Sequence, residues 1–162
     1  AIPHLTDDKN RTLFEKYGVL SHRELEAREE IAYDQYFKTV NIEGETTAEL
    51  ARTMVMPAAV RYLNDVLSAA EKTKALGLDT EGKHSLIAEI NGLVNDLVVA
   101  LQELTRQNAE LGGDDVHSKA HHMRDNVIPA MTTVRSVVDK LEKVLPDDLW
   151  PLPRYREMLF IR

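Results

Sequence analysis

Apolar residues recur along the second half of the chain in steps that alternate between three and four residues. One run comprises Leu86, Ile90, Leu93, Leu97, Ala100 and Leu104, and a second comprises Val116, Ala120, Met123, Val127, Ala130, Val134, Val137, Leu141 and Val144. This alternation is a 3.5-residue repeat, which aligns the side chains along one face of a helix. The Gly112-Gly113 pair between the runs predicts a tight turn, so the two helices are expected to pack nearly antiparallel.

The first half of the chain begins with a short predicted helix and a strong helix-start signal. Gly18 offers the left-handed stop for the short helix. Ser21 and Glu24 then have the spacing of a capping box, in which each side chain bonds the other residue's backbone N–H. A second helix is therefore expected to begin at about residue 22.

A polar stretch over 41–45, which includes Gly44, is expected to interrupt that second helix. The next helix restarts at Thr46 or Thr47. Its inner face is predicted to carry Leu50, Met54, Ala58 and Leu63.

Two prolines fall inside predicted helices. Pro57 and Pro129 each remove one backbone N–H and crowd a carbonyl four residues earlier, so each predicts a kink. The surroundings Val55–Ala58 and Val127–Ala130 are alike over four residues, a likeness we interpret as coincidence. Gly92, within a leucine-rich helix, is expected to permit close helix packing.

These elements predict an all-α fold, an up-and-down bundle of four to five long helices, two of them Pro-kinked, with an extended C-terminal tail. Residues 1–145 are assigned to the bundle, and 146–162 to a docking tail of the same domain. The expected helices span 7–17, 22–43, 47–76, 83–111 and 115–145.

The tail changes character because prolines at 146, 151 and 153 prevent a continuous helix. Its large apolar side chains would be costly to leave in water, at about 1.5–3 kcal/mol each. They are expected to pack on this bundle or on a partner domain. Planar arginine side chains nearby suit carboxylates across an interface. The predicted interface residues are Arg61, Tyr62, Trp150, Leu152, Arg154, Tyr155, Arg156, Leu159 and Phe160.

Composition narrows the possible partners. There are 20 Lys and Arg against 27 Asp and Glu, a net charge of −7, and no basic run, so nucleic-acid binding is not expected. A membrane-spanning segment of about 20 apolar residues is not expected either. The chain has no cysteine, which rules out thiolate chemistry in this chain. It starts at Ala1 rather than Met, as expected either of a processed or excised piece or of a chain whose initiator Met has been removed.

Candidate metal ligands gather at His117, His121 and His122. His117 and His121 are one helical turn apart and could share a metal, although no matching ligand set is evident on another helix. Glu81 with His84, and Asp114 with His117, have a carboxylate-x-x-His spacing. Di-iron bundles place such motifs in mid-helix, whereas these lie at helix starts, so no metal ligand is assigned.

Several blocks of sequence resemble the C-terminal region of type III glutamine synthetases. They lie in the same order, from residue 19 to residue 161, whereas the middle from about 67 to 139 matches only in helical character. The blocks cover residues 19–26, 36–43 with 56–62, and 147–161, the last reading Asp-Asp-Leu-Trp-Pro-Leu-Pro-Arg-Tyr-Arg-Glu-Met-Leu-Phe-Ile.

The resemblance implies a much longer, cytoplasmic parent enzyme that forms ring-shaped homo-oligomers. That parent would join ammonia to glutamate with ATP and Mg²⁺ or Mn²⁺, through a γ-glutamyl phosphate. Its Asn-Gly-x-Gly-x-His loop is absent here, because Asn91-Gly92 continues as Leu93-Val94. We therefore assign this chain no catalytic residue and no cofactor, and expect it to be inactive alone.

The role implied for this chain is a non-catalytic structural and assembly domain. Its tail would dock on the catalytic domain of the same chain or on a neighbouring subunit. The alternative left open by the residues is a free-standing helical bundle that binds a small ligand or a partner protein in a pocket between kinked helices.

Overall fold

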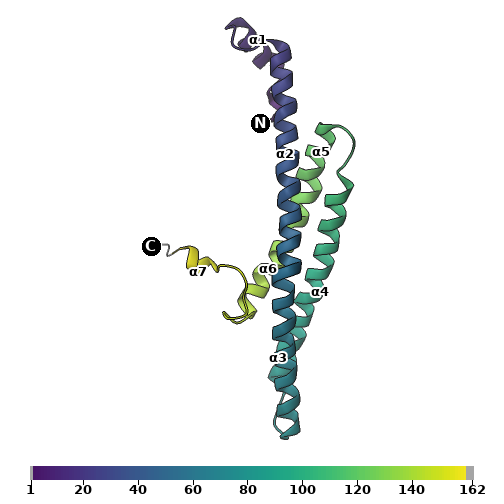
Figure 1. Cartoon of the computed structure of the whole chain (residues 1–162), viewed down its shortest axis with the longest axis vertical. Coiled ribbons are helices and arrows are strands. Elements are labelled where there is room, and N and C mark those ends of the chain that lie inside the picture. Colours follow the sequence, from purple (N-terminus) through teal and green to yellow (C-terminus); the bar gives the residue numbers. More distant parts are fainter. Residues whose placement is uncertain (1, 160–162) are drawn as a thin grey trace.

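A computed structural model shows three long antiparallel helical rods within the part of the chain that it describes, residues 2–159; the side chains of residues 155 and 156 are not described. The first rod joins α2 (His22–Leu50), a π-helical turn η2 (Ala51–Val55) and α3 (Met56–Ala75). The second is α4 (Glu81–Glu110). The third joins α5 (Val116–His122), a π-helical turn η3 (Met123–Val127) and α6 (Ile128–Val144) (Figure 1).

The short elements lie at the two ends of the chain. A single turn, η1 (Ile2–His4), precedes α1 (Asp8–Lys16), and α7 (Tyr155–Met158) ends the described tail. Figure 1 shows α1 and the start of α2 extending beyond the turn between α4 and α5. We call residues 8–30 the N-terminal overhang. The described residues contain no strand, so the expectation of an all-α bundle is confirmed.

The predicted helix ends agree with the structure where capping signals are present. Ser21 and Glu24 form the expected capping box: the Ser21 N–H donates to Glu24 Oε2 at 2.8 Å, and the Glu24 N–H donates to Ser21 Oγ at 3.4 Å. Asp115 accepts the Ser118 N–H at 2.9 Å and caps α5. These short-range bonds satisfy N–H groups that have no partner inside the helix.

The predicted interruption at 41–45 is wrong, because α2 continues through it and joins α3. Gly44 is buried there, and a Cβ at this position would lie 2.7 Å from Asn108 Oδ1. Asn108 Nδ2 donates to the Asn41 carbonyl at 3.3 Å, across the α2–α4 contact. Glycine therefore serves close packing of two helices here, and that packing offsets its weak helix propensity.

The expectation that Gly92 permits close helix packing is wrong. It lies exposed in mid-α4, and a Cβ added there would meet no atom within 4 Å. The sequence pattern marks a glycine inside an apolar helix, but the face it occupies depends on the register of the neighbours.

The two internal prolines lie in the same local backbone geometry. Each lies at the second position of a helix that directly follows a π-helical turn, Pro57 after η2 and Pro129 after η3. The Met56 N–H bonds the Ala51 carbonyl, and the Ile128 N–H bonds the Met123 carbonyl, five residues back in both cases. The wider π turn makes room for the proline ring and for the carbonyl that it leaves without a donor. The likeness treated above as coincidence thus corresponds to a shared backbone geometry.

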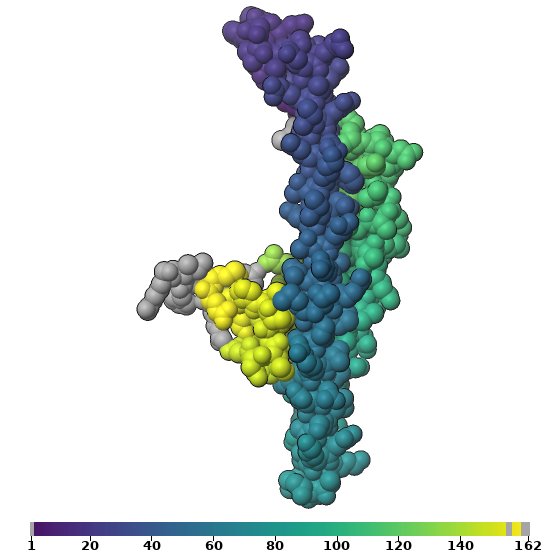
Figure 2. All heavy atoms as spheres, in the orientation of Figure 1, coloured from purple at the N-terminus to yellow at the C-terminus, as the bar shows by residue number. Residues whose placement is uncertain are grey.

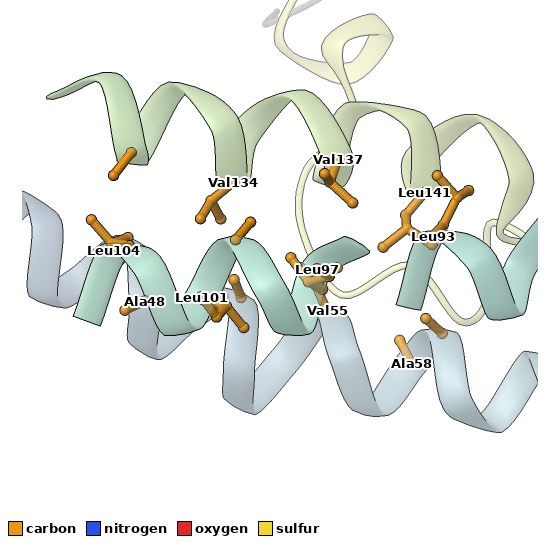
Figure 3. Close-up of a cluster of buried hydrophobic side chains, with 14 of the residues drawn as sticks. Ala48, Val55, Ala58, Leu93, Leu97, Leu101, Leu104, Val134, Val137 and Leu141 are labelled. Atoms are coloured by element: carbon orange, nitrogen blue, oxygen red, sulfur yellow. The ribbon is translucent and has the colours of Figure 1, made fainter. Parts of the chain in front are cut away.

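The core follows the predicted seams along α4 and the third rod. Buried side chains at Leu93, Leu97, Leu101 and Leu104 of α4 meet Val134, Val137 and Leu141 of α6 on one side, and Ala48, Val55 and Ala58 of the first rod on the other (Figure 3). On the first rod the predicted inner face is correct at Ala58, which is buried, and displaced at its N-terminal end. Leu50 is 39% exposed, whereas Ala51 and Val55 are buried, because the π turn shifts the register.

Among the described helices, α4 alone has the length and hydropathy of a membrane-spanning segment. It packs against both α3 and α6. Of its most apolar 18-residue window, 22% is buried inside the bundle.

Candidate docking surface

The tail folds back against the end of the third rod before it leaves the bundle. After α6 ends at Val144, Leu145 adopts an extended conformation and stays in the core. A turn follows, in which the Pro146 carbonyl accepts the N–H groups of Leu149 and Trp150 at 3.2 and 3.1 Å. Trp150 is 9% exposed and belongs to the same core cluster. The first part of the predicted docking tail is therefore an integral part of this bundle.

Arg154 fixes the tail to the C-terminal end of α6. Its Nη1 donates to the Glu142 carbonyl at 2.9 Å and its Nη2 to the Leu145 carbonyl at 2.8 Å, while Nε lies 2.7 Å from Asp147 Oδ1. The guanidinium also lies over the Trp150 ring, 6.0 Å from its centroid. A cation at this position satisfies terminal carbonyls and complements the negative end of the helix dipole.

In Figure 1, α7 stands away from the rods, and in Figure 2 the described part of the tail, in yellow, forms a protrusion on the side of the rods. Met158 is 50% exposed and Leu159 is 79% exposed. The predicted interface residue Phe160 lies outside the described residues, and the side chains of Tyr155 and Arg156 are likewise not described. The exposed end is apolar and has no cover in the part of the chain that the structure describes.

Of the remaining predicted interface residues, two are on α3 and the third, Leu152, belongs to the tail. Arg61 and Tyr62 are on α3, where Arg61 Nε donates to the Pro57 carbonyl of its own helix at 3.3 Å. Leu152 is partly buried against the core and lines a groove that the sequence analysis did not identify. The structure thus brings Trp150, Leu152 and Arg154 together at the end of α6.

The groove runs between the first and third rods, beside the tail. It encloses about 550 Å³. Its walls are mostly apolar, and Glu43 and Arg135 are the charged residues among those that line it. The lining residues are Glu43, Thr47, Leu50, Ala51, Val55, Ile128, Met131, Thr132, Val134, Arg135, Val138 and Leu152.

The groove had a detectable signal in the sequence. Ile128, Met131 and Val138 each follow a seam residue by one position, so they widen the apolar stripe of α6 beyond what two neighbouring helices need. Small side chains such as Ala51 and Thr47 on the facing wall leave the space between the rods unfilled. Apolar walls that stay partly exposed are typical of a contact surface.

The histidine cluster is divided by the structure. The His117 ring lies 4.3 Å from the Tyr33 ring, centroid to centroid, and the His121 ring lies 6.4 Å from it. His122 is turned toward α4, where its Nε2 lies 2.8 Å from the Gln107 carbonyl oxygen. This contact requires the proton on Nε2, and it ties the end of α4 to α5.

Tyr33, on which two of these histidines pack, is a buried residue. Burial, and secondarily the charge of Glu29, raises the pKa of the Tyr33 hydroxyl above its ordinary value. A cavity of about 390 Å³ lies beside Tyr33 and also contacts Tyr36, His121 and Arg124. Arg124 is held by Asp125, through Nε–Oδ1 at 2.6 Å and Nη2–Oδ2 at 2.7 Å.

The metal ions that the resemblance implies for a parent enzyme need several ligands gathered at one point, and its nucleotide needs a phosphate-binding loop. Across residues 2–159, no three His, Asp or Glu side chains are placed to share one metal ion. Asn91 and Gly92, the only trace of the nucleotide-loop motif, are exposed in mid-α4. We derive no catalytic step from this chain.

The comparisons with known proteins agree on one family. Residues 1–74 match the glutamine synthetase C-terminal domain. Over its whole length, the chain is 31% identical to a type-3 glutamine synthetase of Dictyostelium discoideum and 28% identical to a glutamine synthetase of Bacteroides fragilis. A glutamine synthetase of Butyrivibrio fibrisolvens is 24% identical over 98% of the chain.

The chain spans 23% of the length of each of these relatives. The similarity reaches the tail as well as the rods, since it covers 100% of the chain in the first two cases. Residues 1–74 therefore resemble the C-terminal domain of glutamine synthetases, and the whole chain is similar to a stretch that makes up 23% of a type-3 glutamine synthetase.

Proposed function

We propose that this chain is a non-catalytic structural and assembly domain of a cytoplasmic glutamine synthetase. The parent enzyme would ligate ammonia to glutamate with ATP and Mg²⁺ or Mn²⁺, and those ligands would bind in its catalytic domain. The domain's partners would be that catalytic domain and the neighbouring subunits of a homo-oligomer. Within this proposal, the described rods pack against one another and position the tail for contact with a partner.

One observation carries the proposal: an apolar tail end leaves the bundle beside an apolar groove. Leu159 is 79% exposed, and the groove walls include Leu50 and Ile128, which are 39% and 38% exposed. The seams between the rods are filled by Leu, Val and Ala side chains. The exposed side chains of the tail end and the groove are thus suited to contact with another protein surface rather than to catalysis.

The assembly role is tested by truncating the full-length enzyme after Arg154. This cut removes residues 155–162 and keeps Trp150 and Arg154, which the bundle itself uses. A cut at residue 145 would remove core side chains and confuse unfolding with lost docking. We expect the truncated enzyme to lose oligomer mass by light scattering and to lose glutamine synthesis. Full oligomer mass with full activity would refute the assembly role.

A direct test of the non-catalytic assignment uses the 162-residue chain alone. With glutamate, ammonia, ATP and Mg²⁺, we expect no glutamine above the rate without protein. Glutamine formation by the purified chain would contradict the proposal.

The groove volume also favours the second candidate, a free-standing bundle that binds a ligand or a partner protein. About 550 Å³ lies within the range of small-molecule sites. The two candidates differ in the size of the native polypeptide. An antibody against this chain should detect a band of several times its mass if the assembly role is correct. It should detect a band of 18.4 kDa if the bundle stands alone.

A further inference from the structure

We propose that residues 155–161 of one copy bind in the groove between α2 and α6 of a second copy. This inference rests on the proposed assembly role, and it names the segment and the receiving surface. The observations that carry it are the direction of the tail, the composition of its end and the dimensions of the groove.

The tail is directed away from its own groove. Leu152 already lines one part of the groove, so the tail starts at its rim. Arg154 then fixes the point of departure through its bonds to the Glu142 and Leu145 carbonyls. From there the described tail projects outward (Figures 1 and 2), and Met158 and Leu159 remain exposed. The described part of the tail beyond Leu152 does not line the groove of its own copy.

The chemistry of the two surfaces matches. The segment ends with four consecutive apolar residues, Met158 to Ile161, preceded by one acidic and one basic residue, Glu157 and Arg156. The groove is apolar along its walls and carries one acidic and one basic residue, Glu43 and Arg135. Burying both apolar surfaces together removes them from water, which is the main driving force of association.

The dimensions also match. From Glu43 to Val55 the helical wall of the groove rises about 18 Å, at 1.5 Å per residue. Seven residues span about 10 Å as a helix and about 24 Å when extended. The segment therefore reaches along the groove in either conformation.

A second copy is the occupant that supplies one such segment for every groove. The contact joins two different surfaces, a tail and a groove, so it is heterologous. Heterologous contacts generate closed rings when the rotation between copies closes. The proposed contact is consistent with a ring-forming role.

The test uses disulfide trapping, because the chain has no native cysteine. One preparation of the 162-residue chain carries Leu159→Cys and a second carries Met131→Cys, in the groove. After mixing and mild oxidation, we expect a 159–131 disulfide, which can form only between copies.

The matched control replaces Met131→Cys by Val99→Cys, on α4 and 65% exposed. We expect about tenfold less product with the control, because only the bound segment has a raised effective concentration. Equal yields would overturn the proposal.

A second measurement separates this inference from the assembly role. In the full-length enzyme, Ile128→Glu places a charge in the groove, and Val99→Glu places one outside it. We expect only Ile128→Glu to lower the oligomer mass, as truncation after Arg154 does. If truncation dissociates the enzyme while Ile128→Glu leaves it intact, the groove is not the receptor and the assembly role stands. If truncation has no effect, the assembly role itself fails.

Discussion

Two glycines show how the environment of a residue determines its part in the fold. Gly44 and Gly92 both lie inside long helices, where glycine destabilises by about 1 kcal/mol relative to alanine. At Gly44, a Cβ would approach Asn108 Oδ1 at 2.7 Å and Val127 Cγ1 at 3.2 Å. At Gly92 it would meet nothing within 4 Å. Only Gly44 is required by packing.

This difference predicts opposite effects of the same substitution. Gly92→Ala should raise the free energy of unfolding by about 1 kcal/mol, because it gains helix propensity without a clash. Gly44→Ala should lower it by about 1 kcal/mol, since overpacking outweighs the same gain. Urea unfolding of both variants measures the effects. Equal stabilisation by the two substitutions would show that Asn108 moves aside at little cost.

The capping box at the start of α2 predicts a pH dependence. The Ser21 hydroxyl, and after it the Ser21 backbone N–H, donates to Glu24 and lowers the pKa of its carboxyl below the ordinary value. A lowered pKa in the folded state stabilises the fold above the unfolded pKa of about 4.3. That contribution is lost as the pH falls through the folded pKa.

The measurement compares wild type with Glu24→Gln, which keeps an acceptor but cannot ionise. We expect wild type to be the more stable at pH 6 and the difference to shrink at pH 3. Amide exchange in the first turn of α2 reports the local effect. A difference that is the same at both pH values would assign the role of Glu24 to geometry rather than to charge.

At the scale of elements, Arg154 joins the tail to α6. Replacing it by methionine removes two bonds to carbonyls and the Asp147 ion pair, and should cost about 2 kcal/mol, in the range for hydrogen bonds to charged groups. Arg154→Lys should cost about half of that, because the charge stays near the helix end and the two-pronged geometry is lost. Trp150, the single tryptophan, should shift its emission to the red in both variants.

The control for this prediction is Arg61→Met. Arg61 is exposed and bonds a carbonyl of its own helix, so the change in stability should stay within about 0.5 kcal/mol. If Arg154→Lys retained full stability and wild-type emission, the planar fork would not be what holds the tail.

The helices could be predicted from the sequence where local signals determine them. The predictions were wrong where packing between distant parts of the chain determines the structure. Seam residues from Ala120 to Leu141 are buried as the repeat predicts, and the capping box at Ser21 marks a true helix start. The stretch of α2 that was expected to break packs at Gly44 against Asn108, which is distant in the sequence. The groove depends on which faces of two rods meet, and no single-helix pattern specifies that.

At the scale of the whole molecule, one cluster of buried side chains joins the three rods, and other buried side chains lie outside it. Leu97 is fully buried on α4, and Figure 3 shows it beside Val55 of the first rod. It belongs to the cluster that also contains Val137 and Leu141 of the third rod. Leu25 is 1% exposed but lies in the N-terminal overhang and outside that cluster. The rods and the overhang are therefore expected to unfold separately.

Truncating each of these leucines tests that division. Leu97→Ala should lower the free energy of unfolding by about 3–4 kcal/mol, because it opens a cavity in a packed core. Hydrogen exchange should then accelerate in all three rods together. Leu25→Ala creates a similar cavity, yet its effect should be confined to α1 and the first turns of α2, with the main urea transition unchanged. Because α1 packs chiefly on α2, loss of the packing around Leu25 leaves the three-rod core intact. A drop in the main transition with Leu25→Ala comparable to that with Leu97→Ala would mean that the chain folds as one cooperative unit from end to end.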